Sequence, residues 1–566
     1  MTAAPTAGQS AQGLFARARE AHDGERLPEA EQLYRAALAE RADFAEALLG
    51  LGALLHQAGR LHEARECLVK FTELVPGLAY AWEVLGQVLA GLGDRESAIQ
   101  AFSTAAELEP AFVAAHVNLG LMFAALGRAQ AALHALRAAL VIAPDDAEIL
   151  KHYAIVALDA GKPDETLQAA ERAEAAGLDP VQAARLLGLA HLCAQRFGRA
   201  EPEFRRALQA APDSPELVVS LGVTLEGTGR DAEAIAHYRA YLAQHHQDSH
   251  VRFMLALLLL GRGAFGEGWQ HYMARPAARE QRASLAPVLD ARELPGQRVL
   301  VHAEQGLGDE ILFLRYVQEL RRVSRPEAIA YAASPKLQGV LARVPELDEV
   351  RPLDAPPWPG PRVLLGDLPF LCRGAGPAGA LPPPLRIPAL PDRLAKWRGA
   401  LAASGPAPYV AVNWQGGRLQ ARPGQAQWFG RLQVKRIGPE LLGEALRGWP
   451  GTVVCLQWMQ EAADLEAFRK AFGGNVFDAA RAHDDIEDLL ALLESVDELV
   501  GVSSVNAHLR AAACRPGRVL VQQPAEWRWM QSGEHSPWYP EFTVYRQRPD
   551  LDWSDALAQL RRDLGL

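Results

Sequence analysis

The chain of 566 residues is poor in cysteine, and its cysteines form no recognisable pattern. There is no CxxC pair and no close Cys/His pair among the five, which are Cys67, Cys193, Cys372, Cys455 and Cys514. Zinc sites usually show such pairs in the sequence, and scattered free thiols suit a reducing compartment. We therefore expect no metal site and a cytoplasmic location.

Long hydrophobic runs and an excess of positive charge are also missing. The longest apolar run, Met254–Leu260, is far shorter than the ~20 residues that cross a bilayer. The first residues, MTAAPTAGQSAQG, are polar and small, so we expect no export signal. The net charge of −10 argues against nucleic acid as the main partner, although a local basic patch is compatible with it.

Small residues and proline recur at one interval through the first half of the chain. The interval is 34 residues in Gly52, Gly86 and Gly120, in Ala30, Ala64, Ala98 and Ala132, in Gly59, Gly93, Gly127 and Gly161, and in Pro76, Pro110 and Pro144. This period resembles the tetratricopeptide repeat, in which small residues let two antiparallel helices pack closely. We predict about seven units and an imperfect eighth within residues 1–276.

A tetratricopeptide array forms a superhelix whose concave groove usually holds a peptide or a protein segment. The alternative is a purely structural or self-associating solenoid. The repeats alone leave both alternatives open.

The second half alternates short apolar runs with helical patterns, which predicts mostly parallel sheets with right-handed crossovers. We predict a connector at 277–297, a first α/β lobe at 298–392 and a second at 393–566, with a linker at Gly374–Pro391. Strands are expected at Val299–Ala303, Ala328–Ala332, Glu349–Pro352, Val363–Leu365, Tyr409–Val412, Val453–Gln457 and Glu498–Val502. Helices are expected at Glu310–Val323, Ser334–Val344, Leu394–Ala403, Glu440–Leu446, Ile486–Ser495 and Leu509–Cys514. The predicted fold class is therefore an all-α superhelix followed by two α/β lobes that face each other across a cleft.

The turn after the first strand, Glu304–Asp309, is the most informative stretch. It carries Gly306 and Gly308, which allow a tight turn and a close approach of the backbone to a ligand. Asp309 is expected at or beside the start of the next helix. It is either an N-cap or a carboxylate that faces the cleft.

Four segments in this order resemble one family, the bacterial proteins that join tetratricopeptide repeats to a heptosyltransferase-like glycosyltransferase domain. The segments are Glu304–Asp309 with Arg315-Tyr316, Asn413–Gly416, Ser503–Leu509, and Glu526–Trp529 with Ser536–Pro540. The resemblance extends roughly from Gly266 to the C-terminus. It implies a GT-B fold, which has two Rossmann-like lobes, a nucleotide-sugar between them and no need for a metal or another cofactor.

The resemblance also implies roles for particular residues. Asp309 matches the carboxylate that is thought to act as general base on the acceptor hydroxyl. The donor-side positions are matched by Asn413, Gln415, Gly416, Lys435, Arg436, Ser503, Ser504, Asn506 and His508, of which Ser504 and His508 belong to a helix start suited to phosphate. The acceptor side or pocket wall is matched by Glu304, Gln305, Gly306, Gly308, Trp529 and Trp538. Alternatively, the cations are surface charges, His508 is structural and the tryptophans belong to the core.

The chain departs from the family in the third segment. The family usually has Asp-Thr where this chain has Ser503-Ser504, and a glycine-rich helix start where this chain has Arg510–Cys514. The donor site has therefore changed, or the activity has been lost.

The favoured hypothesis is a glycosyltransferase whose repeats recruit a protein acceptor. Some relatives of this architecture modify flagellin, so the resemblance implies Ser or Thr of a flagellin-like acceptor and a donor such as a CMP-linked nonulosonic acid. One alternative is a transferase that acts on lipopolysaccharide or another glycan. The other is a catalytically inactive repeat scaffold.

Overall fold

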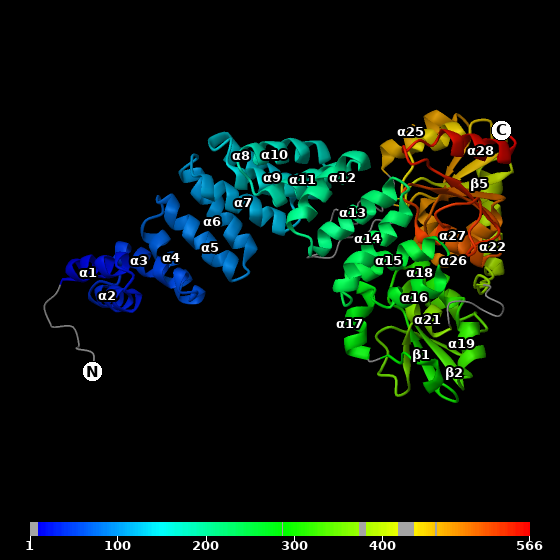
Figure 1. Ribbon diagram of the computed structural model, residues 1–566, viewed down its shortest axis with the longest axis horizontal. Helices are drawn as coiled ribbons and strands as arrows, with labels where there is room; N and C mark the ends of the chain where they lie inside the picture. The colour runs from blue at the N-terminus through cyan, green and yellow to red at the C-terminus, as the bar shows by residue number, and fades with distance from the viewer. Residues whose placement is uncertain (1–9, 286, 373–380, 417–434, 459–460) are drawn as a thin grey trace. The chain divides into compact units, whose positions relative to one another are not determined.

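The computed structural model describes residues 10–285, 287–372, 381–416, 435–458 and 461–566 (Figure 1). The contacts divide the chain into two compact units, Met1–Ala194 and Gln195–Leu566. The division falls inside the repeat array, whereas the repeat pattern of the sequence ends near residue 276. Part of the predicted linker, residues 374–380, lies outside the described residues.

The first unit is built of helices that pack against their neighbours along the chain. They are α1 (Ala11–Asp23), α2 (Leu27–Glu40), α3 (Ala45–Gln57), α4 (Leu61–Leu74), α5 (Ala79–Gly91), α6 (Arg95–Leu108), α7 (Val113–Ala125), α8 (Ala129–Ile142), α9 (Ala147–Asp159), α10 (Pro163–Ala175) and α11 (Pro180–Cys193). Short turns join them, as the blue to cyan part of Figure 1 shows.

The periodic glycines have the roles that the sequence predicts. A Cβ on Gly52 would lie 2.7 Å from Leu68 of the next helix, and one on Gly86 would lie 2.6 Å from Phe102. The other set occupies the turns with positive φ, for example 73° at Gly59 and 83° at Gly93. Glycine adopts that conformation without the steric cost that other residues meet. The helix pairs are therefore packed as in tetratricopeptide repeats.

The second unit begins with the rest of the repeat array. Its helices are α12 (Phe197–Ala210), α13 (Pro215–Gly227), α14 (Asp231–Gln244), α15 (Ser249–Gly261) and the shorter α16 (Phe265–Tyr272). The described chain thus contains sixteen repeat helices, α1 to α16, which correspond to seven units and the imperfect eighth. None of its helices is long and apolar enough to cross a membrane.

Part of the predicted connector is helical. Helix α17 (Pro276–Leu285) follows the repeats, and a short 3-10 turn, η1 (Ala291–Glu293), comes before the first strand. Proline at the first position and the helix-forming residues after it favour this helix. The predicted connector, residues 277–297, therefore contains helical structure in its first nine residues.

The first sheet has four parallel strands in the order β3-β2-β1-β4. They are β1 (Arg298–His302), β2 (Ala328–Ala333), β3 (Glu349–Pro352) and β4 (Arg362–Leu364). The helical segments between and after them are α18 (Leu307–Leu314), α19 (Val317–Ser324), η2 (Pro335–Leu337), α20 (Gln338–Leu341), η3 (Leu365–Asp367) and α21 (Leu368–Leu371).

Two predicted helices of the first lobe differ from the observed ones. The predicted helix Glu310–Val323 is broken into α18 and α19 at Arg315-Tyr316, where the Arg315 side chain turns inward and donates to the Trp538 carbonyl oxygen at 2.8 Å. The predicted helix Ser334–Val344 is reduced to the 3-10 turn η2 and the short helix α20.

The second sheet has six parallel strands in the order β10-β9-β8-β5-β6-β7. They are β5 (Tyr409–Asn413), β6 (Thr452–Cys455), β7 (Val476–Asp478), β8 (Glu498–Val502), β9 (Gly517–Val521) and β10 (Phe542–Arg546). The helices of this part are α22 (Pro391–Ser404), α24 (Pro439–Ala445), α25 (Ala462–Phe472), α26 (Ile486–Ser495), α27 (Val505–Ala512) and α28 (Ser554–Leu564), with the 3-10 turn η6 (Trp527–Trp529). The chain leaves β5 in one direction and returns on its other side at β8, so the strand order reverses between these two strands.

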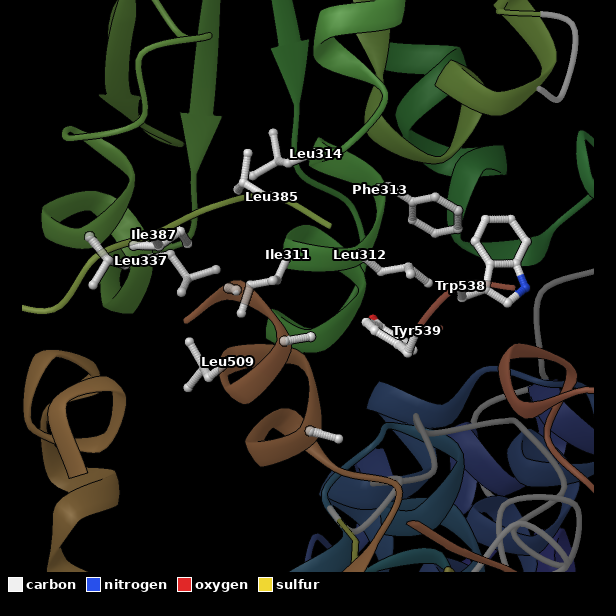
Figure 2. Close-up of a cluster of buried hydrophobic side chains, with 14 of the residues drawn as sticks. Ile311, Leu312, Phe313, Leu314, Leu337, Leu385, Ile387, Leu509, Trp538 and Tyr539 are labelled. Atoms are coloured by element: carbon white, nitrogen blue, oxygen red, sulfur yellow. The ribbon is translucent and has the colours of Figure 1, made fainter. Parts of the chain in front are cut away.

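One apolar core joins both sheets to the last repeat. In Figure 2, Ile311 of α18 lies near Leu509 of α27, and Leu312 points toward Trp538 and Tyr539. The same cluster includes Trp269 and Tyr272 of α16. The Trp269 ring meets the Trp527, Trp538 and Phe313 rings edge to face, with centroids 5.7, 5.8 and 6.0 Å away. The last repeat is therefore part of the α/β core.

A buried group of charges fastens the repeats to the first sheet. Arg275, which follows α16, lies 2.5 Å from Glu304 and 2.6 Å from Asp367, and Arg282 of α17 also lies 2.6 Å from Asp367. The Arg275 side chain is 1% exposed and both carboxylates are fully buried. The carboxylates raise the pKa of Arg275 although burial alone would lower it, so the guanidinium stays charged.

We expect a chain that starts at Gln195 to fold and a chain that starts at Ala277 to fail. The shorter chain lacks Trp269 and Arg275. Loss of Trp269 would expose the apolar core, and loss of Arg275 would leave the buried Glu304 and Asp367 carboxylates without this partner. Circular dichroism with thermal melting distinguishes the outcomes, and a cooperative melt of 277–566 equal to that of 195–566 would contradict the expectation.

The matched point variant in the full chain is Arg275→Met, which should lower the free energy of unfolding by about 3 kcal/mol because one partner of a buried ion group is removed. Arg279→Met is its control, since Arg279 is exposed on the neighbouring helix α17.

Candidate functional site

A cavity of 240 Å³ lies in the second unit, at the carboxyl ends of β5, β6 and β8. Its walls come from both sheets, and they comprise Leu307, Gly308 and Lys336 from the first lobe, and Asn413, Gln415, Gly416, Leu456, Gln457, Trp458, His483, Ile486, Ser504, Val505 and Asn506 from the second. Ligands of open α/β sheets bind outside the carboxyl ends of the strands where the strand order reverses, which is the place between β5 and β8.

The start of α27 forms one wall of the cavity. Ser504 is its N-cap residue with an extended backbone (φ −158°, ψ 176°), and the Ser504 hydroxyl is buried without a hydrogen bond to any described residue. The backbone of Gly416 passes so close that a Cβ there would lie 2.7 Å from the Ser503 carbonyl oxygen. The first amides of a helix lack partners within the helix, so this end suits an anionic or carbonyl group of a ligand.

The polar side chains of the cavity wall also hold the strand ends together. Asn413 Nδ2 donates to the Val502 carbonyl oxygen at 3.3 Å, which ties β5 to β8. The Gln457 side-chain oxygen accepts from the amides of Trp414 at 3.1 Å and Gln415 at 2.8 Å. The wall around the cavity is therefore largely preformed.

His483 and Trp458 complete the second-lobe wall. His483 Nε2 lies 3.0 Å from Asn506 Oδ1, and burial lowers the pKa of His483, so the imidazole is neutral near pH 7. Trp458 follows β6 and is 47% exposed, which leaves a large aromatic surface open at the cavity. Base rings and other flat groups stack on such surfaces.

The cavity suits an anionic ligand. Among its described wall residues Lys336 is the one cation, and none is an aspartate or a glutamate. A single ammonium and a helix N-terminus without opposing carboxylates create a positive potential.

Asp309 lies next to this wall but forms an ion pair. It is the third residue of α18, whose N-cap is Gly306, so the N-cap alternative for Asp309 was wrong. Its carboxylate pairs with Arg528 of η6, and Arg528 also pairs with Glu526. A carboxylate engaged by a guanidinium is a weaker proton acceptor than a free one.

Glu526 is the centre of this charge network. Lys435 Nζ lies 2.8 Å from its carboxylate, and the Ser503 hydroxyl donates to the same oxygen at 2.7 Å. Burial alone would raise the pKa of Glu526, but the Lys435 charge and these hydrogen bonds hold it below the usual value. Lys435 and Ser503 therefore serve the network and do not line the cavity.

His508 belongs to the core rather than to the cavity wall. Its Nδ1 is hydrogen-bonded to the Tyr539 hydroxyl, and a Cβ on Gly308 would lie 2.7 Å from its ring. Burial lowers the pKa of His508 to about 3. His508 is therefore a neutral, enclosed imidazole at the contact between α18 and α27, which fits the alternative of a structural histidine.

The remaining predicted residues are dispersed. Glu304 forms an ion pair with Arg275, and the side-chain amide of Gln305 donates to the Tyr272 hydroxyl at 3.1 Å. Arg436 pairs with Asp464 at 3.2 Å outside the cavity. Trp529 and Trp538 are fully buried core residues, because Trp529 stacks on Tyr539 and Trp538 packs in the aromatic group around Trp269. Of the predicted residues, the structure brings together at the cavity Gly308, Asn413, Gln415, Gly416, Ser504 and Asn506.

Eight wall residues are not among the predicted site residues, and four of them have polar or aromatic side chains: Lys336, Gln457, Trp458 and His483. A partial signal existed, since Gln457 ends a predicted strand, Trp458 directly follows it, and Lys336 comes shortly after another predicted strand. Residues after parallel strands gather at one edge of the sheet.

We expect the protein to lose stability below pH 6.5 through His508. The ordinary pKa of 6.5 applies to the unfolded chain and about 3 to the folded one, so between these values only the unfolded chain binds the proton. The free energy of unfolding then falls as the pH falls, by about 2 kcal/mol at pH 5. His508→Asn should lose less stability between pH 7.5 and 5 in urea unfolding.

His246→Asn, which alters an exposed histidine, should keep the pH dependence of the wild type. An identical pH dependence for His508→Asn and the wild type would show that His508 titrates normally in the folded protein.

Comparisons with known proteins concern mainly the repeats. One tetratricopeptide-repeat family model matches residues 84–147 and 154–215, and another matches residues 21–88 and 191–258. Protein FlbA of Caulobacter vibrioides is 24% identical over 295 residues, which are 48% of this chain and 46% of FlbA. The chain thus spans about half the length of the curated relative that it matches.

Several solved structures resemble part of the chain. The MamA protein is 22% identical, with a TM-score of 0.29, and the match covers 29% of this chain and 91% of MamA. YrrB, described as a tetratricopeptide protein with an unusual peptide-binding site, is 20% identical, with a TM-score of 0.30 and coverage of 31% and 91%. A tetratricopeptide protein from Parabacteroides merdae is 17% identical, with a TM-score of 0.33 and coverage of 44% and 98%.

The 34-residue period, the glycine contacts within the helix pairs and the family models agree with one another. The chain is therefore a tetratricopeptide-repeat protein whose array is followed by an α/β region with two parallel sheets.

Proposed function

We propose that the chain is a glycosyltransferase that moves a sugar from a nucleotide-sugar to a protein acceptor recruited by the repeats. The observation that carries the proposal is the cavity at the reversal of strand order in the second sheet, with the start of α27 on one side and the first lobe on the other. Two parallel sheets with a ligand site between them are also what a GT-B fold requires.

The donor nucleotide fits the polarity of this cavity. The amides of Val505 and Asn506 and the Ser504 hydroxyl are suited to phosphate oxygens, and the exposed Trp458 indole is suited to the base. Gly416 lets the backbone after β5 approach this helix start closely, because any side chain there would meet Ser503. The amides and the ammonium supply the positive charge that a metal ion provides in other transferases.

The acceptor chemistry is assigned to Asp309. The hydroxyl oxygen of the acceptor attacks the anomeric carbon, the bond from that carbon to the nucleotide phosphate breaks, and the bonding electrons leave with the phosphate. The hydroxyl proton goes to the Asp309 carboxylate. Arg528 pairs with both Asp309 and Glu526. When the acceptor hydroxyl replaces Arg528 as the partner of Asp309, Arg528 therefore keeps its ion pair with Glu526.

A Ser or Thr hydroxyl of a flagellin-like protein is the acceptor that we favour. Tetratricopeptide arrays commonly bind peptide or protein segments, and the resemblance to repeat-bearing glycosyltransferases points the same way. A CMP-linked nonulosonic acid is the corresponding donor. Transfer to lipopolysaccharide or another glycan, and an inactive scaffold, are the alternatives that the experiments below separate.

The first experiment is a thermal-shift panel with CMP, UDP, GDP and ADP. A nucleotide present at 100 times its Kd stabilises the native state by about 2.7 kcal/mol, so one of the four should raise the melting temperature. Trp458→Ala should lower the affinity for that nucleotide about tenfold or more, because the stacking of the base on the indole is lost. Tyr80→Ala is the control, since Tyr80 is 50% exposed on α5 in the first unit. If none of the four nucleotides raises the melting temperature, the result favours the alternative of a catalytically inactive repeat scaffold.

The second experiment tests the base. Asp309→Asn should reduce transfer to a purified flagellin-like acceptor by about 100-fold or more, because general base catalysis is lost while the side-chain size is kept. Nucleotide binding by this variant should equal that of the wild type. Mass spectrometry of the acceptor measures transfer, and near-normal transfer by Asp309→Asn would refute the assignment.

A further inference from the structure

We infer that Lys336 of the first lobe binds the phosphate of the nucleotide, so that the ligand is held by both sheets. This inference rests on the proposed function, because it names the cation of the same site. The residues that sequence reasoning assigns to phosphate neutralisation, Lys435 and Arg436, are both paired with carboxylates and neither lines the cavity.

The backbone that carries Lys336 is fixed from the first sheet. Lys336 belongs to η2, which directly follows β2 and the residue Ser334. The buried Glu310 of α18 accepts from the Tyr331 hydroxyl at 2.6 Å, and it also accepts from the Ser334 hydroxyl and from the Ser334 amide. The end of β2 is therefore tied to the same helix, α18, whose first residues line the cavity.

The second sheet holds the same segment from the other side. Arg343, which follows α20, donates to both carboxylate oxygens of Glu487 on α26, at 2.5 and 2.8 Å. Leu337, the neighbour of Lys336, is fully buried in the shared core. The segment from η2 to Arg343 therefore has a defined place against the second lobe, and Lys336 is its residue at the cavity.

The Lys336 side chain itself is exposed at the cavity wall and has no ion pair within the described residues. Its ammonium is close enough to His483 to add to the effect of burial in lowering the pKa of that imidazole. His483 in turn contacts Asn506 in the first turn of α27. The ammonium and the amides at the start of α27 thus border one space from opposite lobes.

A phosphate in this space gains charge–charge attraction from Lys336 and hydrogen bonds from the α27 amides. The attraction grows as the bond to the sugar breaks, because the leaving phosphate gains negative charge. A neutral nucleoside gains none of it. The effect of Lys336 should therefore depend on the phosphate and not on the base.

The test compares CMP with cytidine and UDP with uridine by titration calorimetry on the full chain. Lys336→Ala should lower the affinity for the nucleotide about tenfold or more and leave the affinity for the nucleoside unchanged. Lys336→Arg should restore most of the lost affinity. Lys470→Ala, which removes an exposed lysine outside the cavity, should bind like the wild type. The affinity of the wild type should also fall more steeply with salt than that of Lys336→Ala.

Two results would overturn the inference while the proposed function stands. One is equal nucleotide affinity in the wild type and Lys336→Ala, and the other is an equal loss for nucleotide and nucleoside. If the wild type binds neither CMP nor UDP, and GDP and ADP also fail, the proposed function and the inference both fall. Because Lys336 is exposed, the melting temperature without ligand should be the same in all variants, which confirms that each is folded.

Discussion

The second unit depends on one close approach, the first turn of α18 against α27. Gly308 makes it possible, because a Cβ at this position would lie 2.7 Å from the buried His508 ring. Ile311 continues the contact toward Leu509 (Figure 2). Both helices begin after the carboxyl end of a parallel strand, so packing them together also brings two helix starts to the same cavity. The apolar contact and the ligand site are thus parts of one arrangement.

The buried charges around this contact depend on one another. Asp309, Arg528, Glu526 and Lys435 form a chain of alternating sign, and removing one member would leave a neighbour unpaired in a poorly solvated place. The network also accounts for Ser503, where the glycosyltransferases that the sequence resembles usually have an aspartate. The Ser503 hydroxyl donates to Glu526 at 2.7 Å, whereas an aspartate there would place two carboxylates against each other. Glu526 thus supplies the negative charge in this chain.

Local patterns in the sequence predict the elements well and long-range partners poorly. The glycine period predicted the helix pairs, and the apolar runs predicted β5, β8 and α26 almost to the residue. Some of the glycines and small polar residues after the strands, such as Gly308, Gly416 and Ser504, line one cavity. Glu304 has the same local appearance, yet its partner Arg275 lies 29 residues earlier, in a segment read as the end of the repeats. Trp529 and Trp538 carry no local sign of core or surface, and only tertiary packing decides between them.

Buried polar groups without hydrogen-bond partners bear on whether the cavity binds a ligand. A scaffold gains nothing from a buried hydroxyl without a partner, such as that of Ser504. A buried hydroxyl costs stability when nothing binds it. The buried charges of Arg275 and Glu526, in contrast, have oppositely charged partners. The Ser504 hydroxyl at the start of α27, together with a described cavity wall that has no aspartate or glutamate, is therefore what supports the proposed anion site.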